Sequence, residues 1–323
     1  MSRPPTAADV DEAAQFIRPH LPATPLLRSE GLSRQLGCDY SIKCENLQPV
    51  GAFKVRGGVN LVGRLSADER AAGLVSASTG NHGQSIAWAG RLFGTAVTIY
   101  APAVGANPAK LEAMRQLGAE VYQHGADFDE ARLAAEEAAG AGGQRFVHSA
   151  NEPRLIAGVG TIGVEVLDAA PDMETIIVPI GGGSGAAGMC LAAKARNPEI
   201  EVIGVQSTSA PAAWQAWTER RLDIEATTST PHEGMATRVP FAMTMEILWQ
   251  QLDDFVLVAD DAIDAAIRML AREGRVLAEG AGAASLAAAI QLKQRLRDRR
   301  VCGVLSGGNL PLDRFATVLQ DCA

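Results

Sequence analysis

The chain repeats one local pattern: a short apolar run, a turn that contains glycine, and an alanine-rich helical stretch. Runs such as IIVPI, 176–180, are apolar at every position, which predicts strands that are buried on both faces. Strands that alternate with helices in this way predict parallel sheets covered by helices, and therefore the α/β class. We expect strands at 71–78, 96–102, 120–125, 174–180, 201–207 and 299–309, and helices at 107–119, 127–140 and 262–274.

The length of 323 residues allows one large domain or two medium domains. Two series of strand–helix units run from about 50 to 147 and from 148 to 323. The segment 1–49 contains the strand-like piece DYSIKCEN, and we expect it to join the second series. The sequence therefore predicts a small domain of residues 50–147 and a large domain of residues 1–49 plus 148–323.

Charge and composition argue against several classes of partner. The net charge is −8 and no basic block occurs, which argues against nucleic acid and anionic membranes. The first residues lack the apolar core of a secretion signal, and no stretch approaches the roughly 20 apolar residues of a membrane span. The five cysteines form no C-x-x-C pair, which argues against zinc and favours reduced thiols in the cytoplasm. We expect a cytoplasmic protein that binds a small molecule.

The segment PIGGGSGAAG, 179–188, follows an apolar strand and begins a helix. Its glycines would expose backbone N–H groups at the positive end of the helix dipole, which predicts a phosphate site. The alternative is a tight turn that needs positive φ, for which one or two glycines would suffice. The residues of this predicted phosphate loop are Gly181, Gly182, Gly183, Ser184 and Gly185.

The same segment also matches the dinucleotide fingerprint at Gly183, Gly185 and Gly188. That fingerprint requires an acidic residue about 20 positions later, at the end of the next strand, to bind the ribose. Here the next strand ends at Gln206, and no basic residue beside it would replace the acid for a 2′-phosphate. A nicotinamide-dependent oxidoreductase is therefore a distant alternative.

Three further segments carry candidate chemistry. STGNH, 78–82, is either an ordinary helix cap or a nest for a carboxylate or phosphate. Ser306 in LSGGN, taken alone, is better explained as a turn residue. Lys54 lies in GAFKVRGG, where glycines on both sides would let the backbone approach another strand or a ligand.

Four segments in this order, ENLQPVGAFKVRGG, STGNHGQ, GGGSG and SGGN, resemble the fold-type II, tryptophan synthase beta-like, pyridoxal-phosphate enzymes. The closest branch is the serine/threonine dehydratase and serine racemase group, and the similarity runs from about residue 25 to 310. The resemblance implies two doubly wound parallel-sheet domains, pyridoxal 5′-phosphate in the cleft between them, and a homodimer. A binding protein without catalysis would not need Lys54 or the hydroxyls of STGNH.

The resemblance implies a role for each motif residue. Lys54 would bind the cofactor aldehyde covalently and later take the α-proton of the substrate. Because only a neutral amine can do this, we expect burial or nearby positive charge to lower the pKa of Lys54. The catalytic set is then Lys54, Ser78 and Thr79, and the carboxylate of the substrate would bind at Ser78, Thr79, Gly80 and His82. The cofactor would contact Phe53, Lys54, Asn81 at the phenolic oxygen, the phosphate loop 181–185, Glu279, and Ser306 at the pyridine nitrogen.

The implied reaction is the loss of water and then ammonia from a β-hydroxy amino acid to give a 2-keto acid. The alternative is a racemase, because related racemases have a second serine where Thr79 stands, whereas many dehydratases have alanine. The methyl group of Thr79 restricts its rotamers, which favours elimination. The segment 232–248 should contribute to the substrate side, and Arg238 and Met235 either reshape the pocket or only pack.

Two departures from the family pattern shape the remaining expectations. Related enzymes bind a divalent cation through a glutamate at the position of Gln206, and no acidic residue follows here, so we expect no metal site. The substrate is threonine or serine, or a larger analogue such as phenylserine, hydroxyaspartate or a hydroxyectoine-derived compound. Because the chain ends near residue 323, we do not expect a regulatory domain.

Overall fold

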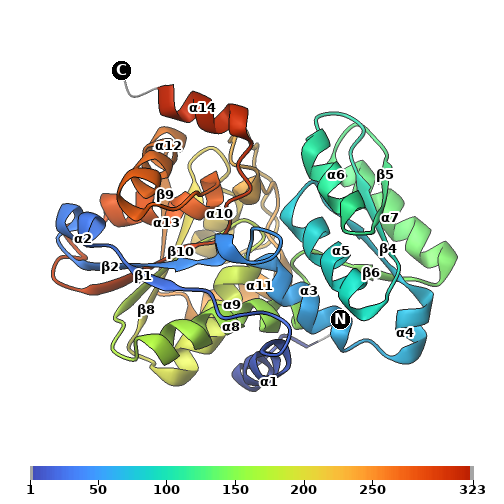
Figure 1. Ribbon diagram of the computed structural model, residues 1–323, viewed down its shortest axis with the longest axis horizontal. Coiled ribbons are helices and arrows are strands. Elements are labelled where there is room, and N and C mark those ends of the chain that lie inside the picture. The colour runs from blue at the N-terminus through green and yellow to red at the C-terminus, as the bar shows by residue number, and fades with distance from the viewer. Residues whose placement is uncertain (1–2, 321–323) are drawn as a thin grey trace.

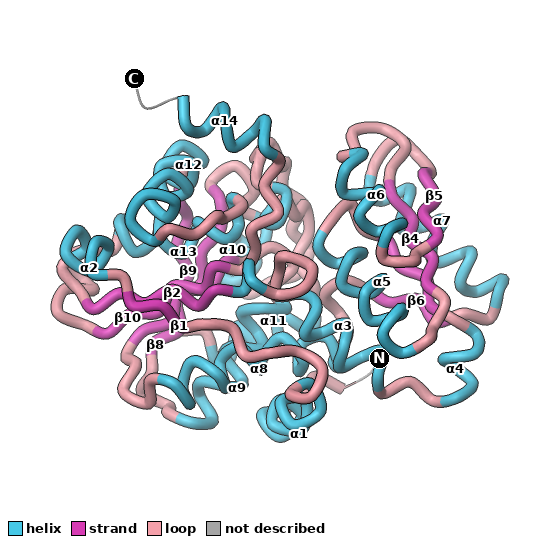
Figure 2. Tube along the Cα trace, viewed as in Figure 1, coloured by secondary structure: helices cyan, strands magenta, loops and turns pink. Residues whose placement is uncertain are grey.

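The computed structural model describes residues 3–320 and contains two separate sheets (Figures 1 and 2). The larger sheet has the strand order β1-β2-β10-β7-β8-β9, and the smaller has the order β5-β4-β3-β6. The larger comprises β1 (Leu26–Arg28), β2 (Asp39–Cys44), β7 (Thr175–Pro179), β8 (Glu201–Ser207), β9 (Asp254–Val258) and β10 (Arg300–Leu305). The smaller comprises β3 (Leu74–Ala77), β4 (Val97–Ala101), β5 (Glu120–Gln123) and β6 (Arg145–Val147).

Every strand pair is parallel except one. The short edge strand β1 runs antiparallel to β2, with Leu27 opposite Ile42. The predicted parallel sheets are therefore confirmed, with one antiparallel strand at this edge that three residues are too few to reveal by periodicity. The strand β2 pairs in parallel with β10 near the other end of the chain. The domain boundaries at 49/50 and 147/148 stay a prediction.

Helices cover both sheets. In the larger unit α13 packs on β7, β8, β9 and β10, while α9 packs on β7 and β8 and also contacts α8, α1 and α11. In the smaller unit α7 packs on β3, β4 and β6, while α5 and α6 contact β4 and β5. Figure 1 shows the smaller unit at the right, with α3 between the units. The helices are α1 (Ala7–Ile17), α2 (Glu30–Leu36), α3 (Lys54–Gly63), α4 (Ala67–Ala72), α5 (Asn81–Phe93), α6 (Pro108–Gln116), α7 (Phe128–Gly142), α8 (Pro153–Ala169), α9 (Ser184–Arg196), α10 (Ala212–Glu219), α11 (Ala242–Gln251), α12 (Asp260–Met269), α13 (Gly280–Gln291) and α14 (Leu312–Gln320).

Local signals explain where several elements begin and end. The side chain of Asn107 caps α6, whose first residue is Pro108, as the Asn-Pro sequence predicts. Gly94 and Gly143 end α5 and α7 in the left-handed conformation. The helix expected at 262–274 is α12 as far as Met269 and continues as one π-helical turn, Leu270–Gly274. No helix of residues 3–320 is long and apolar enough to cross a membrane.

Helix α3 is held by very close contacts with its neighbours. A Cβ atom on Gly58 would lie 2.5 Å from Oγ and 2.6 Å from the carbonyl oxygen of Ser85 in α5. A Cβ atom on Gly57 would lie 3.0 Å from the carbonyl oxygen of Leu155 in α8. Of the two alternatives for these glycines, approach of another part of the chain or of a ligand, the structure shows the first, although the neighbours are helices and not a strand. The glycines let α3 pack against α5 and α8, and this packing fixes Lys54 at the start of α3.

Candidate active site

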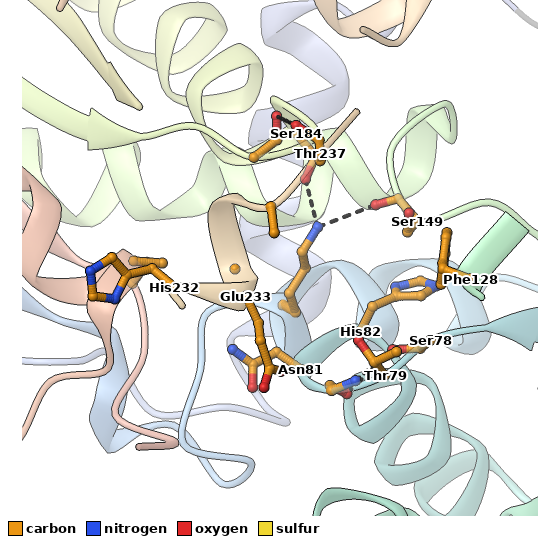
Figure 3. Close-up of a pocket in the computed structure, with 18 of the residues that line it drawn as sticks. Ser78, Thr79, Asn81, His82, Phe128, Ser149, Ser184, His232, Glu233 and Thr237 are labelled. Atoms are coloured by element: carbon orange, nitrogen blue, oxygen red, sulfur yellow. Dashed lines mark hydrogen bonds between the residues drawn. The ribbon is translucent and has the colours of Figure 1, made fainter. Parts of the chain in front are cut away.

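A cavity of about 790 Å³ lies between the two sheets and is lined by residues from both units. Four of its walls are the turns that follow β3, β6, β7 and β10, so the carboxyl ends of strands from both sheets meet there. Figure 3 shows Ser78, Thr79 and His82 on one side of the cavity and His232 on the opposite side. This is the position where ligands bind in parallel α/β folds.

Lys54 is the first residue of α3 and lines the cavity. Its Nζ donates to the carbonyl oxygen of Ser149 at 3.2 Å and to Oγ of Ser184 at 3.0 Å, the two dashed bonds of Figure 3. Burial lowers the pKa of Lys54 to about 8. Neither partner is a carboxylate that would hold the proton on the amine. The amine therefore loses its proton more readily than a free lysine does, as nucleophilic attack on an aldehyde requires.

The loop 181–185 follows β7 and leads into α9. Its backbone N–H groups, and that of Ala186, have no acceptor within residues 3–320, although their neighbours Ile180 and Ala187 do. Gly183 has φ +88°, which favours glycine. A Cβ atom on Gly181 would lie 2.3 Å from the carbonyl oxygen of Gly234. Backbone conformation and close packing therefore explain why glycine stands at 181 and 183. The evidence for an anion site is the set of free N–H groups at the start of the helix.

The third glycine of the dinucleotide fingerprint also has a packing role. A Cβ atom on Gly188 would lie 2.6 Å from the carbonyl oxygen of Ile156 and 2.7 Å from the backbone nitrogen of Gly160, both in α8. The side chain of Gln206 lies at the end of β8, where it accepts from the backbone nitrogen of Trp214. The match to the fingerprint therefore arises from the close approach of α9 to α8.

The side chain of Asn81 is oriented by two hydrogen bonds. Nδ2 of Asn309 donates to the carbonyl oxygen of Val50 and to Oδ1 of Asn81, both at 2.8 Å. The amide of Asn81 consequently presents Nδ2 to Oε1 of Glu279 at 2.7 Å. One hydrogen of Nδ2 is left to donate toward the cavity. Burial raises the pKa of Glu279, which keeps this buried carboxyl easily protonated.

The turn Ser78–His82 begins α5. Oγ of Ser78 accepts from the backbone nitrogens of Gly80 at 3.1 Å and Gly83 at 2.8 Å, so this hydroxyl stabilises the turn. The backbone nitrogens of Thr79, Asn81 and His82 have no acceptor among the described residues. Free N–H groups at the start of a helix favour the binding of an anion, as they do in loop 181–185.

His82 contributes its backbone more than its ring. Nε2 of His82 lies 2.9 Å from Oγ of Ser76, and burial, followed by the charge of Lys54, lowers the pKa of His82 to about 3. The ring is therefore neutral.

Phe53 and Ser306 also line the cavity; a Cβ atom on Gly185 would lie 3.1 Å from the ring of Phe53. The cavity thus brings together all the residues that the sequence assigned to it.

A buried ionic cluster holds the start of α3. Arg56 is fully buried and donates to both oxygens of the buried Glu45, at 2.7 and 2.9 Å, and to both oxygens of Glu165 at 2.7 Å. The charges of both carboxylates raise the pKa of Arg56 against the effect of burial. Glu45 follows β2, Glu165 belongs to α8, and Arg56 lies in α3 two residues after Lys54. The cluster therefore connects these three segments close to Lys54.

Several lining residues were not found from the sequence. His148 follows β6, its Nδ1 accepts from the backbone nitrogens of Ala150 and Asn151 at 3.0 Å, and burial, followed by the charge of Arg132, lowers its pKa. Neutral His148 therefore carries its hydrogen on Nε2. Asn309 is the last residue of the segment LSGGN, in which only Ser306 was considered. The other missed residues lie in segments that carry no recognisable motif. The missed polar residues include Lys110, Arg132, His148, Ser149 and Asn309, and within the predicted segment 232–248 neither Glu233 nor Thr237 was singled out.

The segment 232–248 lines the cavity as predicted, although its two candidate residues differ. Met235 is fully buried in the core and does not line the cavity. Arg238 is half-exposed at the mouth, with Nη1 3.8 Å from carboxylate oxygens of Asp127 and Asp129 at the start of α7. Residues 3–320 hold no cluster of three acidic, histidine or cysteine side chains suited to a metal. That the protein binds no cation stays a prediction.

Residues 17–307 match the model of the family described as "Pyridoxal-phosphate dependent enzyme". The chain is 38% identical over 315 residues to the L-threonine ammonia-lyase of Thermotoga maritima, covering 98% of this chain and 78% of the relative. The processed form of threonine deaminase isoform 2 from Solanum lycopersicum has a TM-score of 0.90 at 30% identity, covering 100% of this chain and 97% of that one. Maize serine racemase has a TM-score of 0.92 at 29% identity, covering 98% and 97%.

Proposed function

Because the chain belongs to the family of pyridoxal-phosphate dependent enzymes, we propose that it is a lyase that removes water and then ammonia from a β-hydroxy amino acid. Its cofactor is pyridoxal 5′-phosphate. The single observation that supports the lyase site most strongly is the partly buried amine of Lys54, hydrogen-bonded to Ser184 beside the free N–H groups of loop 181–186. The names of relatives such as the L-threonine ammonia-lyase of Thermotoga maritima support the same reaction class.

The residues present fit the cofactor. Loop 181–185 would hold the phosphate through its backbone, and Lys54 would hold the aldehyde carbon. Nδ2 of Asn81 would donate to the phenolic oxygen, because its orientation is fixed by Asn309 and Glu279. Ser306 would face the pyridine nitrogen with a hydroxyl, which leaves that nitrogen largely uncharged. When bound, the cofactor supplies an electron sink for the negative charge that develops on Cα of the substrate.

The side chains would then carry out the proton transfer and the positioning. Lys54, freed when substrate binds, accepts the α-proton, for which a pKa near 8 is well suited. The N–H groups of Thr79, Asn81 and His82 would hold the carboxylate of the substrate. With the carboxylate fixed, the α-proton would lie near Lys54, and the β-hydroxyl would leave as water with the proton that Lys54 has taken up. Hydrolysis of the enamine that remains would then release ammonia. The products are a 2-keto acid and ammonia.

A racemase remains the second candidate, because Thr79 places a hydroxyl among the residues that line the cavity and because maize serine racemase has the same fold. Racemisation needs a base on the face of Cα opposite Lys54. Thr79 carries a β-methyl group that limits its rotamers, so elimination is favoured. Chiral chromatography of a reaction with L-serine separates the two, since an excess of D-serine over pyruvate would favour the racemase.

A panel of β-hydroxy amino acids tests the proposed function. We expect release of equal amounts of keto acid and ammonia from threonine, serine, phenylserine, hydroxyaspartate or a hydroxyectoine-derived compound, and loss of release in Lys54→Ala protein. No release from any member would contradict the proposal. We also propose a cytoplasmic homodimer, which gel filtration with light scattering would check.

A further inference from the structure

An ion pair spans the cavity between the two units. Nζ of Lys110, in α6 of the smaller unit, lies 2.6 Å from Oε2 of Glu233 in the short helix Glu233–Met235 of the larger unit. Both residues line the cavity. The Lys110 side chain is 14% exposed and that of Glu233 is 52% exposed. A pair with one partner half in solvent contributes little net free energy, so the ammonium can exchange this partner for another anion.

Lys110 also lies against the turn Ser78–His82. A Cβ atom on Gly80 would lie 3.6 Å from Cδ and 3.9 Å from Nζ of Lys110. The ammonium is therefore close to the free N–H groups of Thr79, Asn81 and His82. Burial raises the pKa of Glu279, and the positive charge of Lys110 acts in the opposite direction.

The other cations of the cavity have different surroundings. Arg132 pairs with Glu136 one turn later in α7, and Arg314 pairs with Asp264. Arg238 lies near the carboxylates of Asp127, Asp129 and Glu225. Lys54 is assigned to the cofactor. Lys110 is thus the cation whose position beside the turn suits an anion held by the turn.

We propose that Lys110 binds the α-carboxylate of the substrate together with the N–H groups of turn 78–82, and that Glu233 holds Lys110 until substrate displaces it. This inference rests on the proposed function only in taking an amino acid as the substrate. The proposal adds the ammonium of Lys110 to a carboxylate site that the N–H groups of turn 78–82 would otherwise form alone. It also means that substrate and Glu233 compete for one ammonium.

The competition makes two substitutions act in opposite directions. Lys110→Met removes the cation, so it weakens binding of a carboxylate. Glu233→Gln keeps the length of the side chain and removes the competing charge, so it strengthens binding. If the pair only closed the cavity, both substitutions would loosen the same contact and would weaken binding alike. Opposite signs therefore distinguish carboxylate binding from a purely structural bridge.

Calorimetric titration of the holoenzyme with 3-hydroxybutyrate and 3-hydroxybutyramide tests this without turnover. The two probes have the same shape, and only the acid is charged. We expect Lys110→Met to raise the Kd of the acid by about tenfold, the usual order for a hydrogen bond to a charged group. Glu233→Gln should lower it by about threefold, since it removes one half-exposed pair. The Kd of the amide should change less than twofold in both. Lys293→Met, at an exposed position, is the matched control.

An unchanged acid Kd in Lys110→Met, or weaker acid binding in Glu233→Gln, overturns the proposal. The proposal is also overturned if the wild-type holoenzyme binds 3-hydroxybutyrate no more tightly than 3-hydroxybutyramide. Glu233→Gln still decides the outcome if Lys110→Met fails to fold. Because binding is measured without turnover, a protein that shows these effects but releases no keto acid would contradict only the proposed function.

Discussion

Replacing Lys54 by methionine should stabilise the cofactor-free protein at neutral pH. Burial lowers the pKa of Lys54 from 10.5 to about 8. At about 1.4 kcal/mol for each factor of ten, the protonated amine costs the folded state about 3 kcal/mol below pH 8. Loss of its hydrogen bonds to Ser149 and Ser184 offsets about 1 kcal/mol. The net gain in the free energy of unfolding for Lys54→Met is then about 2 kcal/mol.

The pH dependence of this gain tests the reasoning. Between pH 8 and 10.5 the unfolded chain still holds the proton that folded Lys54 has lost, so wild-type stability rises with pH. The advantage of Lys54→Met should therefore be full at pH 6.5 and decline through this window. Urea unfolding of both apoproteins at several pH values measures it, with Lys293→Met as the control. A difference that is independent of pH, or a less stable variant at pH 6.5, would refute the explanation.

Two further substitutions test the frame around Lys54. Arg56→Met leaves the buried Glu45 without its cation and should lower the free energy of unfolding by about 3–5 kcal/mol. The double variant Arg56→Met with Glu45→Leu should recover part of this loss. Equal losses in the single and double variants would contradict the ionic account. Gly58→Ala places a Cβ 2.5 Å from Oγ of Ser85 and should cost about 1–3 kcal/mol. Gly140→Ala in α7 meets nothing within 4 Å and should gain about 0.5–1 kcal/mol, so equal effects in thermal unfolding would contradict the packing argument.

The buried strands were the most predictable part of the fold. The run 201–207 coincides with β8, because its middle residues, 202–205, are all apolar or glycine and polar residues stand at both ends. The edge strand β1 was missed, since three residues give no periodicity. The strand β9 and the helices α8, α11 and α13 were also not identified. The helix α13 is apolar around most of its circumference, so it lacks the one-sided pattern that marks a surface helix.

The site residues were predictable where one turn follows one strand. Asn81 and loop 181–185 belong to such segments, whereas Lys54 was singled out by the glycines on both sides of it. The structure brings all of them to one cavity. Lys110 and Glu233 were not predictable, because an ion pair between two units depends on their three-dimensional arrangement. The glycines left two alternatives open. Gly57 and Gly58 suggested the approach of another strand or of a ligand, but only the structure shows that helices approach there.

The most direct test of the account is to locate the covalent attachment of the cofactor. Borohydride reduction of the holoenzyme followed by peptide mass spectrometry should find reduced pyridoxal phosphate on Lys54 and on no other lysine. An unmodified Lys54 peptide from fully loaded, active protein would contradict the account.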